Sequence, residues 1–363
     1  MTRRSERGAV LIHVAFLLLC AFLFSMFSVD YGMLWLARRE AQNAADAAAL
    51  AGAIARAYDD PDPNPSTTSG KVWGATTQTA AQHLILGTPV APSTVEVSYT
   101  CPDGTTKTCV RADVFRDGTH TSTPLPVFFA HLAGISSQNI RASAIAQAKA
   151  SNFSRCLKPW MIPDKWIEAQ APAGAFNPPG DTYVNPGYTL MDIGTIVTLK
   201  PGDPSMAISP SDYYEIEPCP TPGSCYPDDI RGCGLEGGLG DPMPVLPGNR
   251  VGPTVQATQD LIDQDPGAMW NGTAVVGGCA PNCPGDSPRK VAIAMFDPAA
   301  FEMQKRQSGK FDVTIVNLMG FFIMSVDNRS NVTGVLIGKA GSLRGGGEPD
   351  DNAAFLKVIL LVR

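Results

Sequence analysis

Residue types that commonly carry out chemistry are scarce in this chain, apart from the cysteines. Only four histidines occur among the 363 residues, and none of them follows His131. The C-terminal half therefore has no histidine for a Ser-His-Asp triad, a Cys-His pair or a histidine-based metal site of its own. The GxSxG, P-loop and HExxH patterns are also absent from the sequence. We expect no catalytic, cofactor-binding or metal-binding residues, and hence a protein that is not an enzyme.

Carboxylates and aromatic residues in the second half keep two alternatives open. Several acidic residues between positions 192 and 241 would suit a glycan hydrolase, although their abundance gives no geometry. Exposed aromatic rings can stack on sugar rings, so Trp160, Trp166 and Trp270 are candidates for glycan stacking. The competing interpretation of these rings is core packing in a Pro-rich fold.

The cysteines carry the strongest chemical signal. Of the nine cysteines, Cys20 lies inside a long apolar stretch and the others follow it. An even number of cysteines in a Gly/Pro-rich chain predicts disulfides and an oxidising compartment. Residues 95–100 and 110–115 have the pattern of two strands, which would place Cys101 and Cys109 at the facing ends of one loop. Zinc is the alternative, but the spacings lack the close CxxC pairs of zinc sites. The disulfide candidates are Cys101, Cys109, Cys156, Cys219, Cys225, Cys233, Cys279 and Cys283.

The apolar stretch, residues 9–29, is the element around which the rest of the chain is arranged. It carries no formal charge when His13 is neutral. At about 1.5 Å per residue, a helix of this length spans roughly 30 Å, the thickness of bilayer hydrocarbon. A secretory signal would have a shorter apolar region and would end in a small-residue cleavage site. We expect an uncleaved transmembrane helix, and a long helix in a soluble core is the alternative.

Charges around this stretch predict its orientation. Arg3, Arg4 and Arg7 precede it, which favours a cytoplasmic tail over residues 1–8 and an extracytoplasmic remainder. The expected location is thus the cytoplasmic (inner) membrane, crossed once. The formal net charge is −6, and no long basic run follows the apolar stretch, so we do not expect nucleic acid as a partner.

An Ala-rich helix is expected to continue from the membrane over residues 30–58. Its small residues recur at alternating spacings of three and four, as in a heptad seam. Alanine seams let helices approach closely, which suits side-by-side assembly with another helix; packing on the chain's own domain is the alternative. The seam consists of Leu34, Ala37, Ala41, Ala44, Ala48, Ala51 and Ala55.

Two domains are expected beyond a Pro-rich linker at residues 59–70. The first, residues 71–150, has the pattern of a small α+β domain, with a helix on a three-stranded antiparallel sheet. Its expected elements are helices at 73–86 and 125–132 and strands at 95–100, 110–115 and 139–148. The second, residues 151–363, is rich in Cys, Pro and Gly and should be mainly β, as a barrel or a sandwich. In this ectodomain we expect one clear helix at 255–264 and a central strand at 355–362.

Motifs around the apolar stretch resemble those of a known family. Arg7-Gly8-Ala9-Val10 opens the stretch, Asp30-Tyr31-Gly32 closes it, and QNAADAAALAGA follows at residues 42–53. This arrangement closely resembles the TadE/TadG-like family of tight-adherence (Flp) pilus assembly proteins. The match is close over residues 4–55 and weaker to about residue 150, where the α+β region resembles the family's small, pilin-like domain.

One departure from the family pattern concerns His13. TadE-type pseudopilins carry a Glu five residues after the glycine of the Arg-Gly junction, and this chain has His13 at that position. The resemblance therefore favours a retained, TadG-related anchor over a processed pilin-like subunit.

The resemblance implies a membrane-anchored, non-enzymatic structural or assembly component of a Tad (Flp) pilus or related surface apparatus in the bacterial envelope, with a role in cell adhesion. Its expected partners are the lipid bilayer and subunits of the pilus apparatus or other TadE/TadG-like proteins. A glycan- or cell-wall-binding ectodomain is the alternative function, with cell-wall glycan as partner, and an envelope glycan hydrolase is a lesser one. No functional residue beyond position 155 is taken from the family.

Overall fold

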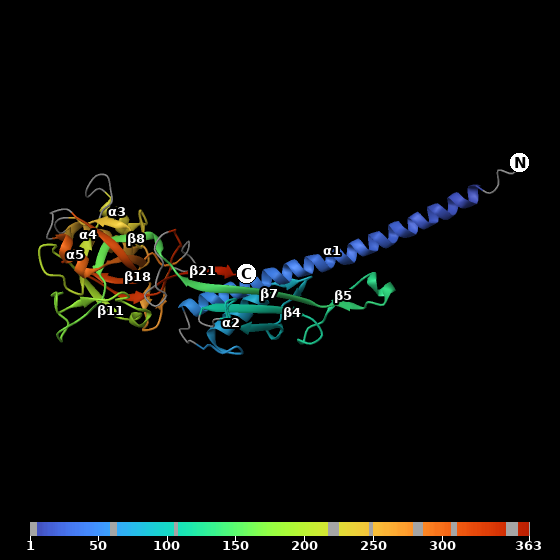
Figure 1. The fold of residues 1–363 in the computed structure, drawn as a ribbon, viewed down its shortest axis with the longest axis horizontal. Helices are drawn as coiled ribbons and strands as arrows, with labels where there is room; N and C mark the ends of the chain where they lie inside the picture. The colour runs from blue at the N-terminus through green and yellow to red at the C-terminus, as the bar shows by residue number, and fades with distance from the viewer. Residues whose placement is uncertain are drawn as a thin grey trace. The chain divides into compact units, whose positions relative to one another are not determined.

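The structure is a computed structural model that describes residues 6–58, 64–104, 108–216, 225–246, 250–278, 286–305, 311–345 and 355–362. Residues 1–5 of the expected tail and 59–63 of the expected linker lie outside this description. The chain divides into two compact units. Unit 1 comprises Met1–Ala148 with Ile359–Arg363, and unit 2 comprises Lys149–Val358. Figure 1 shows the elements of both.

The first element of unit 1 is one uninterrupted helix, α1, which runs from Glu6 to Tyr58. Its 53 residues correspond to roughly 80 Å of helix at about 1.5 Å per residue. The apolar stretch and the Ala-rich stretch are therefore parts of one rod, as expected from the sequence. A run without proline between them allows this continuity, since nothing removes a backbone donor or forces a kink.

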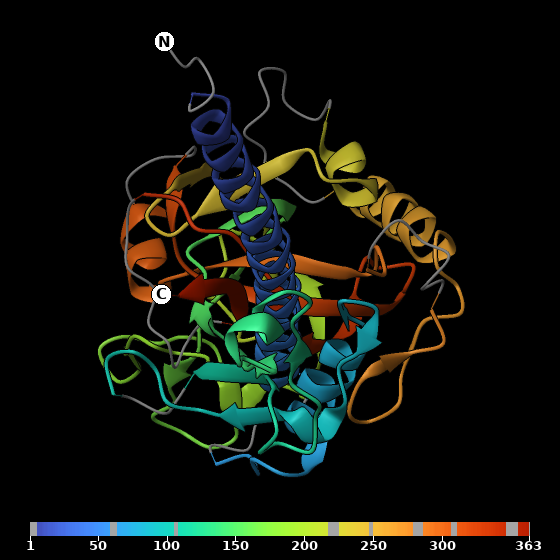
Figure 2. The ribbon, with the colours of Figure 1, turned by 90° about the vertical axis from the view of Figure 1, so that its right-hand side faces the viewer.

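A short helix and a sheet pack on the C-terminal half of α1. The sheet has the order β21-β7-β4-β3, in which β3 with β4 and β4 with β7 are antiparallel pairs. Figure 2 looks nearly along α1 and shows α2 and these strands beside the helix. The elements are α2 (Gly70–Ala81), β3 (Val95–Ser98), β4 (Cys109–Arg116), β7 (Ile140–Ala150) and β21 (Leu356–Val362).

Strand β7 shows how sequence pattern becomes structure here. Its residues alternate between buried alanines and exposed or half-buried polar side chains along most of its length. Because successive side chains of a strand point to opposite faces, this pattern places one face on the helices and the other in solvent. The side chains on the buried face are small, which lets α1 approach the sheet closely.

The remaining elements of unit 1 are short. Residues 84–89 form a hairpin of β1 (Leu84–Ile85) and β2 (Thr88–Pro89), so α2 ends earlier than the helix expected at 73–86. A 3-10 turn, η1 (Pro92–Thr94), precedes β3. The helix expected at 125–132 is absent from these described residues. They contain the short strand β5 (Leu125–Pro126) and the 3-10 turn η2 (Ala130–Ala133), and β5 pairs with β6 (Ser137–Gln138). Proline at position 126 disfavours helical backbone at Leu125.

Unit 2 is built on a closed barrel, which confirms the mainly-β expectation and selects the barrel over the sandwich. The ring runs β8-β17-β18-β19-β11-β12 and returns to β8. Two of its pairs, β8 with β17 and β11 with β12, are parallel. The barrel strands are β8 (Phe153–Pro163), β11 (Ile196–Pro201), β12 (Asp212–Glu215), β17 (Lys290–Phe296), β18 (Asp312–Val326) and β19 (Val332–Ile337).

Side chains fill the core of unit 2. Trp160, Tyr213, Phe296 and Phe321 are fully buried in one apolar cluster. Small barrels have interiors only wide enough for their own side chains, so this core is packed.

Helices and short strands surround the barrel. The helices are α3 (Tyr226–Arg231), α4 (Val251–Asp263) and α5 (Pro298–Lys305), with a 3-10 turn η3 (Leu190–Asp192). β13 (Leu235–Gly238) pairs with β8, and β14 (Pro242–Pro244) pairs with β18. Two small hairpins join β9 (Trp166–Ile167) to β10 (Thr182–Tyr183) and β15 (Met269–Trp270) to β16 (Val275–Val276). β20 (Lys339–Ala340) runs parallel to the start of β21.

The last strand differs from its expected place. We expected residues 355–362 to form a central strand of the second domain. Instead, β21 neighbours β20 and β7 in sheet order, and from Ile359 onward it belongs to unit 1, where Ile359 packs on the apolar core. Sheet membership depends on long-range pairing, which the apolar composition of a strand does not specify.

Candidate functional site

The N-terminal half of α1 is the most unusual surface in unit 1. α1 is the one helix in the described part of the chain that is long and apolar enough to cross a membrane. Its side chains from Val10 onward are largely uncovered; Leu11 and Phe24, for example, are each 72% exposed. Soluble proteins rarely expose contiguous apolar surface of this size, which marks the stretch for contact with lipid or protein.

Polarity changes in steps along this helix. The apolar stretch gives way to two exposed aromatic residues, Tyr31 and Trp35, at 58% and 53% exposure. Exposed Arg38 and Arg39 follow, and the Arg39 guanidinium lies 5.1 Å from the centre of the Trp35 ring. The order apolar, aromatic, basic is typical of a helix that leaves the hydrocarbon and passes through the headgroup region.

Asp30, at the end of the apolar stretch, holds a distant loop of unit 1. Its carboxylate accepts backbone N–H hydrogen bonds from Phe128 and Phe129, both at 2.9 Å, and from Ala130 at 2.7 Å. The 3-10 turn η2 has no side-chain cap of its own. Asp30 therefore supplies the carboxylate that usually comes from a neighbouring capping residue. We call residues 127–135 the clamped loop.

A second carboxylate of α1 acts in a similar way. Glu40 accepts a backbone hydrogen bond of 2.6 Å from Leu86, which has a positive φ of 46° in the turn between β1 and β2. The helix thus holds two turns of unit 1 by charge-assisted hydrogen bonds, in addition to its apolar packing. Sequence inspection did not find either role. Asp30 and its partners are about a hundred positions apart, and no short motif relates them.

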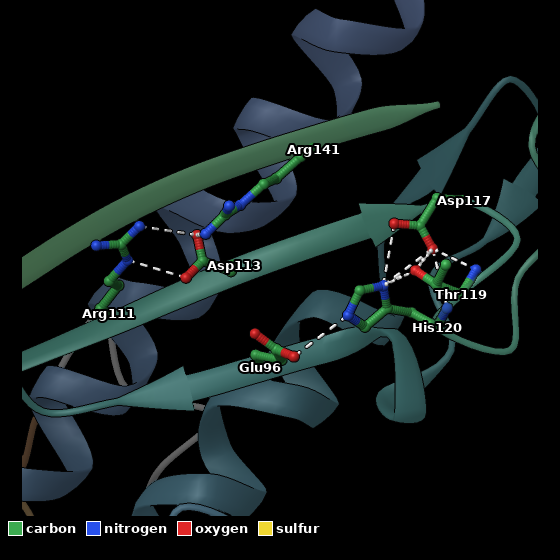
Figure 3. Close-up of polar contacts among 7 residues, drawn as sticks. All are labelled: Glu96, Arg111, Asp113, Asp117, Thr119, His120 and Arg141. Carbon is green, nitrogen blue, oxygen red and sulfur yellow. Dashed lines mark hydrogen bonds and ion pairs between the residues drawn. The ribbon is translucent and has the colours of Figure 1, made fainter. Parts of the chain in front are cut away.

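Unit 1 also contains a polar cluster around His120 (Figure 3). Asp117 accepts hydrogen bonds from the backbone N–H groups of Thr119 and His120 and contacts the His120 ring Nδ1 at 2.9 Å. On the other side of the ring, Nε2 lies 3.2 Å from a carboxylate oxygen of Glu96. The ring stacks on Phe115 with 3.9 Å between centroids.

These contacts shift both pKa values. The hydrogen bond with Asp117 is the main cause that raises the pKa of His120, against an opposing effect of burial. Burial would raise the pKa of Asp117, but hydrogen bonds from His120 and Thr119 outweigh it and lower the value to about 2. A carboxylate lies at each ring nitrogen, so neither nitrogen of His120 is free to act as a base. The cluster fixes the loop after β4.

Nearby, Asp113 of β4 forms ion pairs within its own strand and with the neighbouring strand β7. It forms ion pairs with Arg111 at 2.9 Å and with Arg141 of β7 at 3.3 Å (Figure 3). Among the described residues, no group of three or more His, Cys, Asp or Glu side chains is arranged to hold a metal ion.

Unit 2 contains one lysine whose pKa has the profile of a reactive amine. Burial and the nearby charge of Lys339 lower the pKa of Lys158 to about 7. Its Nζ, however, donates to the carbonyls of Asp229, Ile230 and Gly232 at 3.2, 2.8 and 2.6 Å, and the residue is 1% exposed. Lys158 therefore caps the C-terminal end of α3, because it donates hydrogen bonds to carbonyls that lack intrahelical partners.

The structure corrects two of the three proposed glycan-stacking residues. Trp160 is fully buried, with its indole N–H donating to the Tyr226 hydroxyl at 3.0 Å. Trp166 is 8% exposed and packs edge-on against Phe176. Trp270 is half-buried beside the small cluster around Phe322. Trp160 and Trp166 have no free face for a sugar, because their rings are needed to fill the core.

The candidate cysteines form disulfides where they are described. Cys101 is bonded to Cys109, the pair expected from the two strands, and Cys156 is bonded to Cys233. Cys225 is also disulfide-bonded, and Cys20 is a free, exposed thiol. The other three candidates, Cys219, Cys279 and Cys283, lie outside the described residues.

The alanine seam of α1 is used inside unit 1. Ala37, Ala41, Ala44 and Ala48 are fully buried in the core that α1 shares with α2 and the sheet, and Ala55 is 3% exposed. Leu34 and Ala51 are half-buried. This is the alternative interpretation of the seam, packing on the chain's own domain. The apolar half of α1 remains uncovered.

Comparison with known proteins locates the family resemblance in α1. Residues 8–56 match the Flp pilus-assembly TadE/G-like family. No curated protein and no solved structure matches the chain. The matched segment contains the uncovered apolar half, Asp30, Glu40 and the buried alanines, which are the features that define the site. The family similarity of this chain is therefore to the Flp pilus-assembly TadE/G-like family, over residues 8–56.

Proposed function

We propose that this protein is a non-enzymatic, membrane-anchored component of a Tad (Flp) type pilus apparatus or a related surface assembly. α1 spans the cytoplasmic membrane once, the N-terminus lies in the cytoplasm, and both units lie outside it. The observation that carries this proposal is the uncovered apolar half of α1, which falls within the segment that matches the pilus-assembly family.

Three further features support the proposed topology. Arginines at positions 3, 4 and 7 precede the apolar stretch, in agreement with the positive-inside rule. Exposed aromatic and basic residues follow it in the order expected at a membrane surface. The disulfides in both units fit an oxidising compartment on the far side of the membrane.

The assembly role leads us to expect contacts with other pilus components. α1 already uses its alanine face within unit 1, so the surfaces of the two units are available for partners. Small residues are few in residues 10–29, which suggests that the anchor contacts lipid over most of its surface.

The proposal is tested by crosslinking envelopes that contain the full-length protein and purifying it with its attached partners. Enrichment of the secretion ATPase, platform or pilin subunits of a Tad apparatus is the expected result. A matched sample in which residues 1–29 are replaced by a cleavable secretion signal should lose these partners, because the released ectodomain no longer stays at the membrane. Recovery of the wild-type protein without any apparatus subunit would contradict the assembly role.

Topology is tested separately with protease added to intact spheroplasts. Digestion of both units in spheroplasts, with protection of a tag placed before residue 6, is expected. Full protection of both units would contradict the proposed orientation.

A further inference from the structure

An apolar groove lies between α1 and the clamped loop in unit 1. Its cavity volume is about 520 Å³. One wall includes Leu23, Met26 and Phe27 of α1, and the other includes Leu125, Phe129 and Leu132. The two oxygens of Asp30, which also lines the groove, are already engaged by three backbone N–H groups. The walls therefore present mainly hydrocarbon to whatever lies between them.

The position of the groove along α1 places it within the membrane region. Leu23 precedes Asp30 by seven positions, which corresponds to roughly 10 Å along the helix. The groove thus extends from the level of Asp30 back along the apolar stretch that we assign to the bilayer. Figure 1 shows the β5 end of unit 1 extending beside α1 in that direction.

The clamped loop presents apolar side chains to its surroundings. Phe128 is 59% exposed, Leu132 is 80% exposed and Ile135 is 42% exposed. Phe128, Phe129 and Leu132 lie outside the apolar core that α1 forms with the sheet. Loops run over the protein surface, and a contiguous exposed apolar patch marks a site of contact with protein or membrane.

Two features hold the clamped loop in a fixed conformation. The carboxylate of Asp30 fixes its N-terminal part, and Gly134, with φ of 81°, ends η2 in the left-handed conformation that glycine favours. Loop and helix therefore keep the groove open at a defined width.

We propose that the clamped loop is a second membrane contact, and that an acyl chain of a bilayer phospholipid occupies the groove. This inference rests on the proposed membrane anchoring. The groove is continuous with the uncovered apolar face of α1, so lipid that covers the helix reaches the groove without crossing a polar barrier. Arg38 and Arg39 lie roughly 12 to 14 Å beyond Asp30, at the level where the phosphate of such a lipid would lie.

The test uses photocrosslinking of the full-length protein in phosphatidylethanolamine and phosphatidylglycerol vesicles. Leu132, Leu17 or Ile54 is replaced, one at a time, by p-benzoylphenylalanine, and adducts are identified by mass spectrometry. All three side chains are exposed and apolar. Leu17 reports on the anchor, and Ile54 lies on α1 roughly 36 Å beyond Asp30, on the part of the helix outside the bilayer.

Lipid adducts at positions 132 and 17, with none at 54, are the expected result. Adducts at 17 without adducts at 132 would overturn the lipid contact and leave the anchoring intact. Absence of lipid at both positions would overturn the anchoring itself. A crosslink from position 132 to a second copy of the chain, in place of lipid, would overturn the assigned occupant.

The role of the clamp is tested by Asp30→Asn in the chain labelled at position 132. An asparagine loses the charge and presents a donor to the loop N–H groups, so the lipid adduct at 132 should fall about fivefold or more. Asp46→Asn is the matched control, since Asp46 accepts a side-chain hydrogen bond from Gln42 in the same helix. Unchanged adduct yield at position 17 shows that the variant still inserts. An unchanged yield at 132 in Asp30→Asn would overturn the role of the clamp.

Discussion

His120 lies between two carboxylates on the surface of unit 1, and the charge of its ring is linked to folding. Because the pKa is raised in the folded state, the protonated ring contributes stability that is fully present below the unfolded pKa, about 6.5. This contribution is lost as the pH rises through the folded pKa. The ionised carboxylate of Asp117, whose pKa is lowered, contributes stability at the other end of the pH range. This contribution is lost only as the pH falls towards about 2.

We therefore expect a pH-dependent difference between wild type and His120→Asn. Unfolding midpoints measured from about pH 5 to about pH 9 should differ most at the acid end and converge above the folded pKa. In an Asp117→Asn background the same comparison should depend much less on pH, since the main cause of the shift is removed. A difference that grows with pH would contradict this account.

Lys158 allows a second prediction for a single residue. Lys158→Met removes a donor from three carbonyls at the end of α3, and two of them, those of Asp229 and Ile230, belong to buried residues. The free energy of unfolding of unit 2 should fall by about 2–4 kcal/mol in denaturant titrations. Lys165→Met is the matched control: Lys165 pairs with Asp192 and is 54% exposed, so its loss should cost less than about 1 kcal/mol. Equal effects of both variants would contradict the structural role of Lys158.

Single residues were predictable from sequence where their partners are near in the chain. The pairing of Cys101 with Cys109 follows from two adjacent strands, and the bond has a separation of only eight residues. Asp30 and Lys158 depend on partners about a hundred and more than seventy positions away. Their roles arise only when the fold brings those backbone groups together. Trp160 was misjudged because an aromatic ring in a Pro-rich stretch has the same sequence signature whether it is buried or exposed.

At the scale of elements, the contact of α1 with α2 and β4 depends on Gly52. A Cβ at this position would lie 2.7 Å from Val110 Cγ1 and would also clash with the Thr76 hydroxyl. Glycine is needed here because the helix and the sheet approach too closely for any side chain.

Gly52→Ala should therefore reduce the free energy of unfolding of unit 1 by about 1–3 kcal/mol, the usual cost of overpacking. Gly74→Ala in α2 is the matched control, because nothing lies within 4 Å of its added Cβ. That variant should be more stable than wild type by about 0.5–1 kcal/mol, since alanine favours helix. Hydrogen exchange of α1 and β4 peptides measures both effects. Greater stability of Gly52→Ala would show that the close approach is not needed.

The periodicity of apolar residues predicted where strands occur but not how the strands pair. The alternation in β7 predicted a half-buried strand, and the structure extends it by two residues, to Ala150. β18 is continuous through Gly320, whose backbone lies against Ile337 of β19. Closure of the barrel needs the parallel pair of β8 with β17, two strands far apart in sequence, and strand patterns contain no information on such a pair.

On the scale of the whole molecule, the two described disulfides close loops of very different length. Cys101–Cys109 has a sequence separation of 8, and Cys156–Cys233 has a separation of 77. In the chain-entropy model, removing the first by paired Cys→Ala changes should cost about 2–3 kcal/mol and removing the second about 4–5 kcal/mol. Denaturant titrations followed by hydrogen exchange in each unit measure the two losses of stability and check which is larger. A larger loss from the short loop would contradict the entropic account.

The path of the chain gives a further prediction for the whole molecule. Residues from Ile359 belong to unit 1, although the chain reaches them only after completing unit 2. A stop codon after Val358 should therefore increase hydrogen exchange in β7 and α1 and leave the barrel strands β17 and β18 protected. Loss of protection confined to the barrel would show that these residues support unit 2 instead.

The continuity of α1 has a mechanical consequence. The same rod begins in the proposed membrane span and ends with its alanines buried among α2 and the sheet, with no flexible joint between them. Tension between membrane and ectodomain would therefore act directly on the core of unit 1. Extraction of the anchor under load and unravelling of this folded unit would then be one coupled event.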